Sequence, residues 1–213
     1  MHHAAGPAAP LDTSGAALHV NLESSKNVDV IEAIKARRSI KRFTDRPVGR
    51  EEIERLLEVV PLAPNHRMTE PWGFLVFGDE AKRAYARVLG RRRSRRVEDA
   101  DAAAAVREKV MRETTAVPAI VAVTMKLDEN PEIREEDYAA TYMGIQNLLL
   151  AALKMGLGTH VKTGAVMDDP ELRDALAVPS DRRVVALIFI GEPAEVPDQK
   201  PRAAATGRTT WLP

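Results

Sequence analysis

The stretch ARRSIKRF holds four cations within eight residues: Arg37, Arg38, Lys41 and Arg42. A guanidinium donates paired hydrogen bonds to a phosphate, and Ser39 adds a hydroxyl donor between the cations. Ile40 and Phe43 are expected to serve as apolar anchors for the stretch. This spacing indicates side chains that converge on one anion. The residues alone leave another interpretation open, in which Arg37 and Arg38 only complement the negative end of a preceding helix.

Other patterns that carry chemistry are incomplete in this chain. The chain has no cysteine, which excludes a thiolate nucleophile, a disulfide and a cysteine-ligated metal. His66 and His160 lack metal-ligand spacing, so no metal site is expected. The segment GLGTHVKTG has its glycines in the wrong register for a dinucleotide-binding loop, and it follows a predicted helix instead of a strand. Its KTG matches one motif of penicillin-recognising enzymes, but no S-x-x-K accompanies it.

A second basic run, Arg91–Arg96, lies in GRRRSRRVEDAD. It could form a phosphate-binding patch, but acidic residues follow at once and no aromatic residue interleaves for base stacking. A solvated helix end or loop is the favoured interpretation. The whole chain has 31 basic and 31 acidic residues and a formal net charge of zero. No global field therefore draws it to nucleic acid or to an anionic membrane.

The length of 213 residues, 45% of them hydrophobic, predicts a single domain around one sizeable core. The longest apolar runs are far shorter than the roughly 20 residues that a membrane-spanning helix needs. We therefore expect a soluble protein without a membrane partner, and the absence of cysteine fits the cytoplasm. Residues 1–26 are rich in Ala, Gly, Pro and Ser and show no periodicity, which predicts a disordered N-terminal tail.

Hydrophobic periodicity predicts the order of the elements. Helices are expected at residues 27–38, 48–60, 79–89, 97–114, 138–155 and 170–176. Strands are expected at residues 71–78, 118–127, 159–163 and 184–190. Asn27 is the expected N-cap of the first helix, and Pro61 and Pro64 should end the second. Because strands and helices are interspersed without a regular βαβ repeat, the pattern favours an α+β fold over a doubly wound sheet.

The segment 138–155, YAATYMGIQNLLLAALKM, is the longest periodic pattern. It is apolar nearly all round, so this helix should lie inside the core. Gly156 and Gly158 follow it and should stop it. At the other extreme, the chain ends in an aperiodic segment that nevertheless carries Trp211 and Leu212. A large aromatic side chain is costly to leave in water, so this segment should dock, either on a partner or back on its own subunit.

Four blocks of the sequence resemble, in order, the FMN-dependent nitroreductases: EAIKARRSIKRFTDRPV, APNHRMTEPWGFLVF, YMGIQNLLLAALKMGLGTHVKTGA and VVALIFIGEPAE. The similarity runs from about Val28 to Glu195, and the short APNH block is similar to the minimal branch of the family, which lacks the larger lid insertions. The resemblance implies an α+β, nitroreductase-like fold in which helices flank a central, mostly antiparallel sheet around a long buried core helix. Residues 27–195 would form this FMN-binding domain. Residues 196–213 would be a C-terminal extension that reaches the partner subunit of a homodimer.

The resemblance also implies which residues bind the cofactor. Positions that match the motif for the FMN phosphate and ribityl chain are Arg37, Arg38 and Ser39. Lys41 matches a basic position directed at the pyrimidine edge of the flavin. Positions that in the minimal branch touch the flavin ring from the partner subunit are Leu62 and His66.

Two later segments complete the implied site. A second flavin-contact segment maps onto Val161, Lys162 and Thr163. The stretch that relatives are proposed to hold against the nicotinamide maps onto Ala151, Ala152, Leu153, Lys154, Met155 and Gly156. Relatives commonly carry tryptophan at the position of Val161, so the smaller side chain would widen the pocket or shift the flavin ring.

The implied activity is an FMN-dependent NAD(P)H oxidoreductase that reduces nitroaromatics, quinones or a similar electrophile in a ping-pong cycle. Because a flavin transfers hydride and electrons itself, the lack of a nucleophile or a triad agrees with this activity. Lys41 would stabilise the negative charge of the reduced flavin. Two alternatives stay open. One is a relative with another reaction, such as dehalogenation or flavin fragmentation, and the other is a non-enzymatic flavin- or nucleic-acid-binding module that works through Arg91–Arg96.

Overall fold

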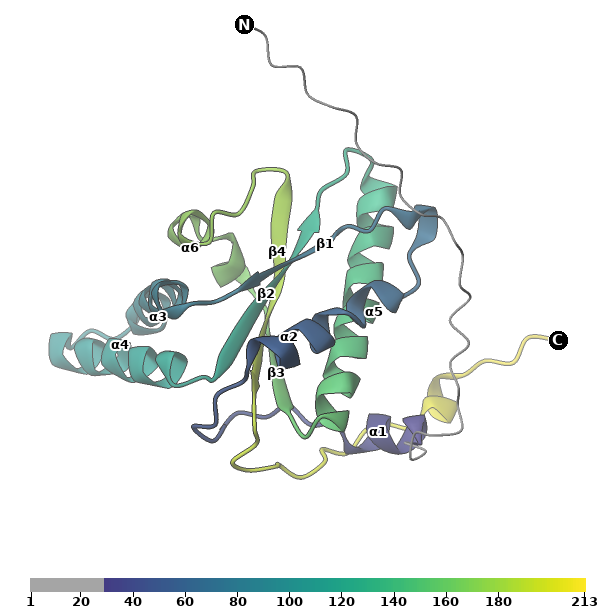
Figure 1. Cartoon of the computed structure of the whole chain (residues 1–213), viewed down its shortest axis with the longest axis horizontal. Coiled ribbons are helices and arrows are strands. Elements are labelled where there is room, and N and C mark those ends of the chain that lie inside the picture. Colours follow the sequence, from purple (N-terminus) through teal and green to yellow (C-terminus); the bar gives the residue numbers. More distant parts are fainter. Residues whose placement is uncertain (1–28) are drawn as a thin grey trace, which may run out of the picture.

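The computed structural model of the chain describes residues 29–213 (Figure 1). The predicted tail, residues 1–26, and the predicted N-cap Asn27 lie outside the described residues. The α-helices are α1 (Val30–Ala36), α2 (Arg50–Leu57), α3 (Asp79–Ser94), α4 (Ala100–Thr115), α5 (Pro131–Lys154) and α6 (Pro170–Ala175). The strands are β1 (Trp72–Val76), β2 (Ala119–Lys126), β3 (Gly158–Lys162) and β4 (Arg182–Gly191). Short 3-10 helices are η1 (Val60–Leu62), η2 (His66–Met68), η3 (Ala165–Asp168) and η4 (Ala205–Arg208).

The four strands form one sheet in the order β1-β2-β4-β3, and every neighbouring pair is antiparallel. The predicted α+β class with a mostly antiparallel sheet is confirmed. β2 and β4 are central, and all of β2 except its last residue is buried. Both of its faces are covered, which explains why its sequence is apolar from Ala119 to Met125 except at Thr124, instead of alternating.

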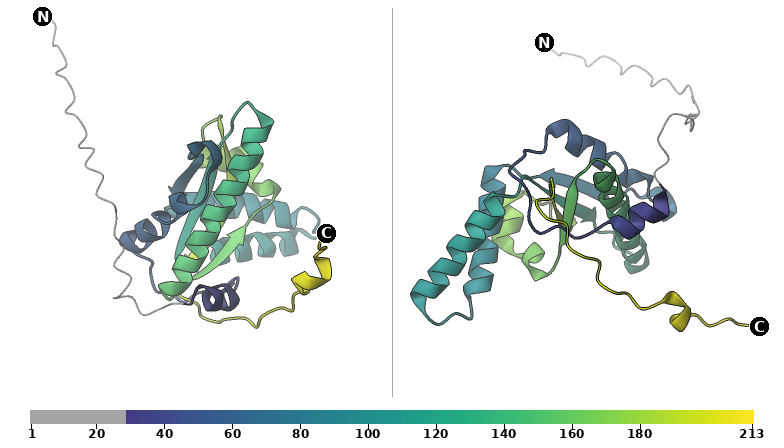
Figure 2. Two further views of the ribbon diagram at one scale, coloured as in Figure 1. Left: turned by 90° about the vertical axis from the view of Figure 1, so that its right-hand side faces the viewer. Right: turned by 90° about the horizontal axis from the view of Figure 1, so that it is seen from below.

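Helices cover both faces of the sheet, and Figures 1 and 2 show the strands between the two helical layers. On one face, α2 and α5 enclose a core that includes Leu56, Val121 and Leu148. On the other face, α3, η3 and α6 enclose a second core around Tyr85, whose ring makes edge contacts with Phe77 and Phe189. α4 packs against α3 on the outer side of that layer.

α5 is the long core helix that the sequence predicts, but it begins at Pro131, seven residues before the predicted start. Asn130 caps it by accepting a hydrogen bond from the backbone N–H of Glu132, and proline suits the first helical position because its missing N–H would be unpaired there. The face that includes Ile145 and Leu148 is buried in the core. Its outward face carries Tyr138 and Met143, which are 40% and 42% exposed, so the single chain leaves an apolar surface there.

Other helix ends also differ from prediction. The first helix begins at Val30, and Asp29 is its N-cap. The second ends at Leu57, and Pro61 instead lies in the separate helix η1. The third continues to Ser94, five residues past its predicted end, because arginine is a good helix former and suits the negative helix terminus. The basic run is therefore a helix end, as favoured from the sequence.

Beyond β4 the chain leaves the sheet as an extended segment with one short helical turn, η4, and Figure 2 shows it running away from the body of the molecule. Trp211 and Leu212 are 90% and 85% exposed. The tail therefore does not bury these two side chains against its own chain. Among residues 29–213, no helix is both long and apolar enough to cross a membrane.

Candidate functional site

The cationic stretch lies where α1 meets the edge strand β3. α1 ends at Ala36, and Arg37 adopts an extended conformation (φ −58°, ψ 129°) that carries the chain alongside β3. The backbone N–H of Ile40 donates to the carbonyl oxygen of Thr159 at 2.9 Å, and Ile40 is buried. Gly158 permits this approach, since an added Cβ would lie 2.5 Å from the Ile40 side chain. The predicted anchoring role of Ile40 is confirmed.

The four cations of the stretch differ in their partners. Arg42 forms an ion pair with Glu195. Arg38 donates to the carbonyl oxygens of Lys35 and Arg37 at 2.5 and 3.0 Å, and so caps α1. Within residues 29–213, the side chains of Arg37 and Lys41 have no hydrogen-bond or ion-pair partner, and Arg37 is half-buried. These two cations are therefore available to a ligand.

A further contact joins this stretch to the C-terminal tail. The guanidinium of Arg38 donates to the side-chain oxygen of Gln199 at 3.2 Å. The next residues of the tail include two more cations, Lys200 and Arg202. This tail segment was not among the residues predicted for the site, although its basic residues are a visible signal. Only the fold places it beside a residue 161 positions earlier.

β3 adds positive charge to the same region. Burial, followed by the charges of Lys162 and Lys41, lowers the pKa of His160 to about 4. Burial, followed by the charges of Arg93 and Lys41, also lowers the pKa of Lys162. The Lys162 ammonium lies 5.5 Å from the centre of the Phe189 ring. Cations from three separate segments therefore repel one another here, and a bound anion would relieve this repulsion.

This donor set fits a phosphate-bearing cofactor such as FMN. The unpaired guanidinium of Arg37 and the ammonium of Lys41 are the chemical groups that recognise a phosphate dianion. Ser39 is exposed and supplies a hydroxyl between them. We call the region formed by Arg37, Ser39, Lys41 and Lys162 the cationic junction.

The predicted segment Val161–Thr163 does not present its side chains to one side. Val161 packs against the core on the α5 face of the sheet, whereas Lys162 lies over Phe189, which belongs to the core of the opposite face. This split follows from the alternation of side chains along a strand. By the same alternation His160 is on the face of Lys162. Sequence reasoning missed His160 at the site, although the two-residue spacing from Lys162 was a signal for it.

The predicted nicotinamide segment is the last turn of α5. The N–H of Leu157 donates to the carbonyl oxygen of Ala152 at 2.8 Å, and Gly156 takes a left-handed φ of 74°. This is a Schellman-type helix end, which favours glycine at that position. Gly156 therefore stops the helix as predicted. Ala152 is fully buried, so only its neighbours in the segment, of which Lys154 and Gly156 are exposed, can meet a ligand.

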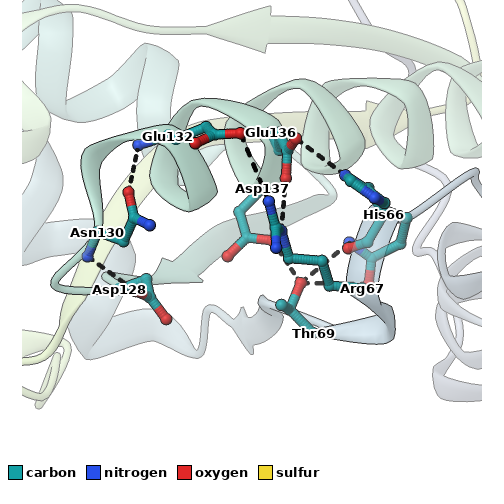
Figure 3. A network of polar contacts seen from close by, with 9 residues as sticks. His66, Arg67, Thr69, Asp128, Asn130, Glu132, Glu136 and Asp137 are labelled. Carbon is teal, nitrogen blue, oxygen red and sulfur yellow. Dashed lines mark hydrogen bonds and ion pairs between the residues drawn. The ribbon is translucent and has the colours of Figure 1, made fainter.

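Leu62 and His66 lie on a different part of the surface. Leu62 is 75% exposed at the end of η1, and His66 belongs to a loop that rests on the first turns of α5 (Figure 3). Its Nδ1 lies 2.9 Å from Oε1 of Glu136, and the Arg67 guanidinium donates to the other oxygen of that carboxylate. The hydroxyl of Thr69 donates to Asp137, which is buried.

His66 and the cationic junction are at opposite ends of α5. Glu136, the partner of His66, is in the N-terminal half of the helix, whereas the junction follows its C-terminal end (Figure 1). A helix rises about 1.5 Å per residue, so the rise from Glu136 to Lys154 is about 27 Å. Within one chain the structure does not bring these two predicted groups together.

The model of the Nitroreductase family matches residues 34–192, which is most of the chain. The chain belongs to the nitroreductase family. A protein of Bacillus subtilis named "Putative NAD(P)H nitroreductase YfhC" is 34% identical over 179 residues, which cover 84% of this chain and 92% of that protein. More distant relatives carry other names. They include a 5,6-dimethylbenzimidazole synthase of Rhodospirillum rubrum, 29% identical over 75% of this chain, and an iodotyrosine deiodinase of Nematostella vectensis, 25% identical over 81%.

Solved structures of this family have the same fold. A nitroreductase-like family protein from Bacillus cereus superposes with a TM-score of 0.77 at 28% identity, and covers 88% of this chain and 98% of its own. The FMN- and NADPH-dependent nitroreductase NfnB of a Sphigopyxis strain gives a TM-score of 0.70 at 19% identity, over 87% of this chain and 100% of its own. The nitroreductase-like fold predicted from the resemblance is confirmed.

Proposed function

We propose that this nitroreductase-family chain is an FMN-dependent NAD(P)H oxidoreductase that reduces nitroaromatics, quinones or similar electrophiles in a ping-pong cycle. The observation that carries the proposal is the cationic junction. Its cations come from two segments, Arg93 of α3 adds positive charge beside Lys162, and Arg37 and Lys41 have no anionic partner in the part of the chain that the structure describes. The family includes FMN-dependent enzymes, which supports FMN as the anion that these cations bind.

Arg37, Arg38 and Ser39 would hold the phosphate and ribityl chain of FMN, and Lys41 would face the pyrimidine edge of its ring. When bound, FMN supplies the redox chemistry, because it accepts a hydride from NADH or NADPH and returns two electrons to the electrophile. The chain's own residues bind, orient and stabilise charge. Lys41 and Lys162 would supply positive charge near the bound cofactor, which would favour its reduced, more negative form electrostatically.

The last turn of α5 would lie beside the nicotinamide. Lys154 and Gly156 are exposed there, and Gly156 carries no side chain that would block a flat ring. Val161 and Thr163 at the end of β3 would line the same pocket. The small side chain of Val161 leaves room there for a bulky acceptor.

The proposed enzyme is a homodimer with FMN between the subunits. The separation of His66 from the junction supports this assembly, because Leu62 and His66 can meet a flavin at the junction only if they come from a second copy. Exposed apolar side chains also support it. Val30, Ile31 and Ile34 on α1 are 63%, 55% and 50% exposed, and neighbouring exposed apolar side chains of this kind mark interaction surfaces.

The absorption spectrum of the purified protein tests the proposal. We expect a yellow protein with flavin bands that bleach anaerobically on addition of NADH or NADPH and return on addition of a nitroaromatic or a quinone. Purification without flavin, together with failure to take up added FMN, would contradict the cofactor. A yellow protein that neither nucleotide bleaches would contradict the electron donor. A cytoplasmic location remains a prediction, which cell fractionation tests.

A related reaction on the same cofactor is the second candidate, and the relatives named as a deiodinase and as a synthase favour considering it. A substrate panel separates the candidates. Turnover of iodotyrosine faster than that of any nitroaromatic or quinone would favour dehalogenation. Loss of the flavin absorption with formation of a benzimidazole under oxygen would favour flavin fragmentation.

A further inference from the structure

A hollow of about 560 Å³ lies between the C-terminal turn of α3, the start of α4 and the N-cap of α6. None of its lining residues belongs to the candidate flavin site. We call it the arginine hollow, and it is lined by Arg91, Arg92, Ser94, Arg95, Val97, Ala103, Arg107 and Asp169. Figure 1 shows α3 and α4 packed side by side, with α6 next to α3.

In the part of the chain that the structure describes, only one of the four arginines of the hollow has an acidic partner. Arg91 pairs with Glu171 at 2.6 Å and approaches Asp169 at 3.6 Å, which ties α3 to α6. Within residues 29–213, no carboxylate pairs with Arg92, Arg95 or Arg107. Arg92, Arg95 and Arg107, which are exposed, therefore line the hollow without a neutralising carboxylate.

One donor of the hollow, Arg107, is held against α3. Ser94 is 7% exposed, and its hydroxyl accepts a hydrogen bond from Nη1 of Arg107 at 3.4 Å and donates to the carbonyl oxygen of Arg91 at 3.3 Å. Gly90 brings the helices together, because an added Cβ there would lie 3.3 Å from the backbone of Arg107. Arg107 of α4 is therefore held against the C-terminal part of α3.

We propose that the arginine hollow is a binding site for a small phosphorylated anion, distinct from the site proposed for FMN. Guanidinium groups bind phosphate oxygens in pairs, and ligand sites commonly enclose about 300–1,000 Å³. Nucleic acid is the less favoured occupant. Its single strands need aromatic side chains for base stacking, and none lines the hollow.

Arg93 supports the separation of the two sites. It lies in the same turn of α3, but its positive charge lowers the pKa of Lys162, in addition to the effect of burial, and also acts to lower the pKa of Tyr85, against the effect of burial. Arg93 therefore belongs to the side of α3 that faces the sheet and the cationic junction. Arg92 and Arg95 line the hollow instead.

Titration of the full-length protein with pyrophosphate by isothermal calorimetry tests the proposal. Saturating FMN is kept present, so that any flavin phosphate site is occupied. We expect saturable binding in low salt, weakened about tenfold or more by Arg95→Ala or Arg107→Ala, since each removes one charge-assisted hydrogen bond. The matched control is Arg112→Ala on the same helix as Arg107, because Arg112 is exposed, near only Glu108, and absent from the hollow. It should bind pyrophosphate like the unaltered chain.

Several results would overturn the proposal. One is no pyrophosphate binding at millimolar concentration, and another is equal binding by Arg95→Ala, Arg107→Ala and the unaltered chain. A single-stranded oligonucleotide that binds through Arg95 and Arg107 while pyrophosphate does not would assign the surface to nucleic acid. Flavin content is measured in every variant. It should be unchanged in all of them, so a failure here is distinguishable from a failure of the proposed oxidoreductase.

Discussion

The Nδ1 atom of His66 lies 2.9 Å from Oε1 of Glu136, and Nε of Arg67 lies 3.1 Å from the second oxygen of the same carboxylate. Glu136 thus holds two consecutive residues of one loop. That loop is under backbone strain, since Arg67, Met68 and Glu70 have left-handed φ values of 67°, 51° and 45°. Each costs on the order of 1–2 kcal/mol for a residue with a Cβ. Such a conformation persists only where contacts over-determine it, which is the role of Glu136 here.

Glu136→Gln should flatten the dependence of stability on acid pH. The hydrogen bonds from His66 and then Arg67 lower the pKa of Glu136. A carboxyl whose pKa is lowered in the folded state stabilises the fold. This stabilisation is complete at pH values above the pKa of the carboxyl in the unfolded chain, about 4.3, and it is lost as the pH falls through the pKa in the folded chain. The melting temperature of the variant should therefore lie below that of the unaltered chain at pH 7 and approach it near pH 3.

Glu135→Gln is the matched control for this prediction. Glu135 is the preceding residue of α5, is exposed, and has no ion pair in the described chain. Its melting temperature should follow that of the unaltered chain at every pH. Equal pH profiles for Glu136→Gln and Glu135→Gln would show that the contacts of Glu136 do not hold the loop.

His66→Ala should change the bound flavin without unfolding the protein. His66 is exposed in the single chain, so its loss removes little packing. In the proposed dimer, however, it touches the flavin of the other subunit. We expect a shifted flavin absorption maximum and a rate of reduction by NAD(P)H that changes severalfold, measured by stopped-flow spectroscopy. An unaltered spectrum with unaltered rates would leave His66 a residue of the loop only.

The order and type of the elements were predictable from sequence, whereas several of their ends were not. Asn27 and Asp29 are both good N-caps two residues apart, and local chemistry does not distinguish them. The Schellman end at Gly156 was predictable because glycine after a long apolar helix is a strong local signal. The extension of α3 through Arg93 was not, since a basic run suits a helix end and a loop equally.

The candidate site was only partly predictable, because a local sequence pattern does not contain contacts between distant residues. Arg37 and Lys41 stand out as a local cluster, and the resemblance added Lys162. That His160 and Arg93 belong near Lys162 depends on pairing between β3 and β4 and on the packing of α3. Those contacts join residues tens of positions apart, and no local pattern contains them.

Arg37→Ala and Arg38→Ala should both weaken FMN binding, by about tenfold or more, because each removes a charge-assisted hydrogen bond to the phosphate. They should differ in stability. Arg38 caps α1 and bonds Gln199, so its loss should also lower the melting temperature. Arg37 donates no such bond within residues 29–213, so its loss should leave the melting temperature nearly unchanged.

Fluorescence titration with FMN measures both affinities, and Arg42→Ala is the control from the same stretch. Arg42 is already paired with Glu195, so its removal should change FMN affinity little. If Arg38→Ala, folded by circular dichroism, binds FMN with unchanged affinity, the phosphate assignment to Arg38 is wrong.

His160→Gln should improve stability in mild acid and nowhere else. Burial and the charges of Lys162 and Lys41 lower the pKa of His160 to about 4 in the folded state, from an unperturbed value of 6.5. Between these values the unfolded chain binds a proton that the folded chain does not, so stability falls as pH decreases from 6.5 to 4. Melting temperatures of the unaltered chain and the variant should agree at pH 8 and diverge at pH 5 in favour of the variant. Agreement at both pH values would contradict the lowering of the His160 pKa by burial and by the neighbouring cations.

Two truncations should separate the roles of the C-terminal tail. Removal of residues 205–213 takes away Trp211 and Leu212, which the single chain leaves exposed. Burial of such side chains on a partner would contribute roughly 1.5–3 kcal/mol each, so the dimer should weaken by about tenfold or more. Removal of residues 198–213 also deletes Gln199, the partner of Arg38. The longer truncation should therefore lose FMN as well as dimer stability.

Light scattering with flavin quantification measures both effects. Trp211→Ser in the full chain is the matched variant, because it removes the aromatic anchor and keeps the tail's length and its cations. The Trp211→Ser variant should resemble the shorter truncation. Its dimer should be weaker, but it should still bind FMN at the cationic junction when the subunits are concentrated. A chain without residues 198–213 that stays dimeric and fully loaded with flavin at micromolar concentration would remove the tail from both the interface and the cofactor site.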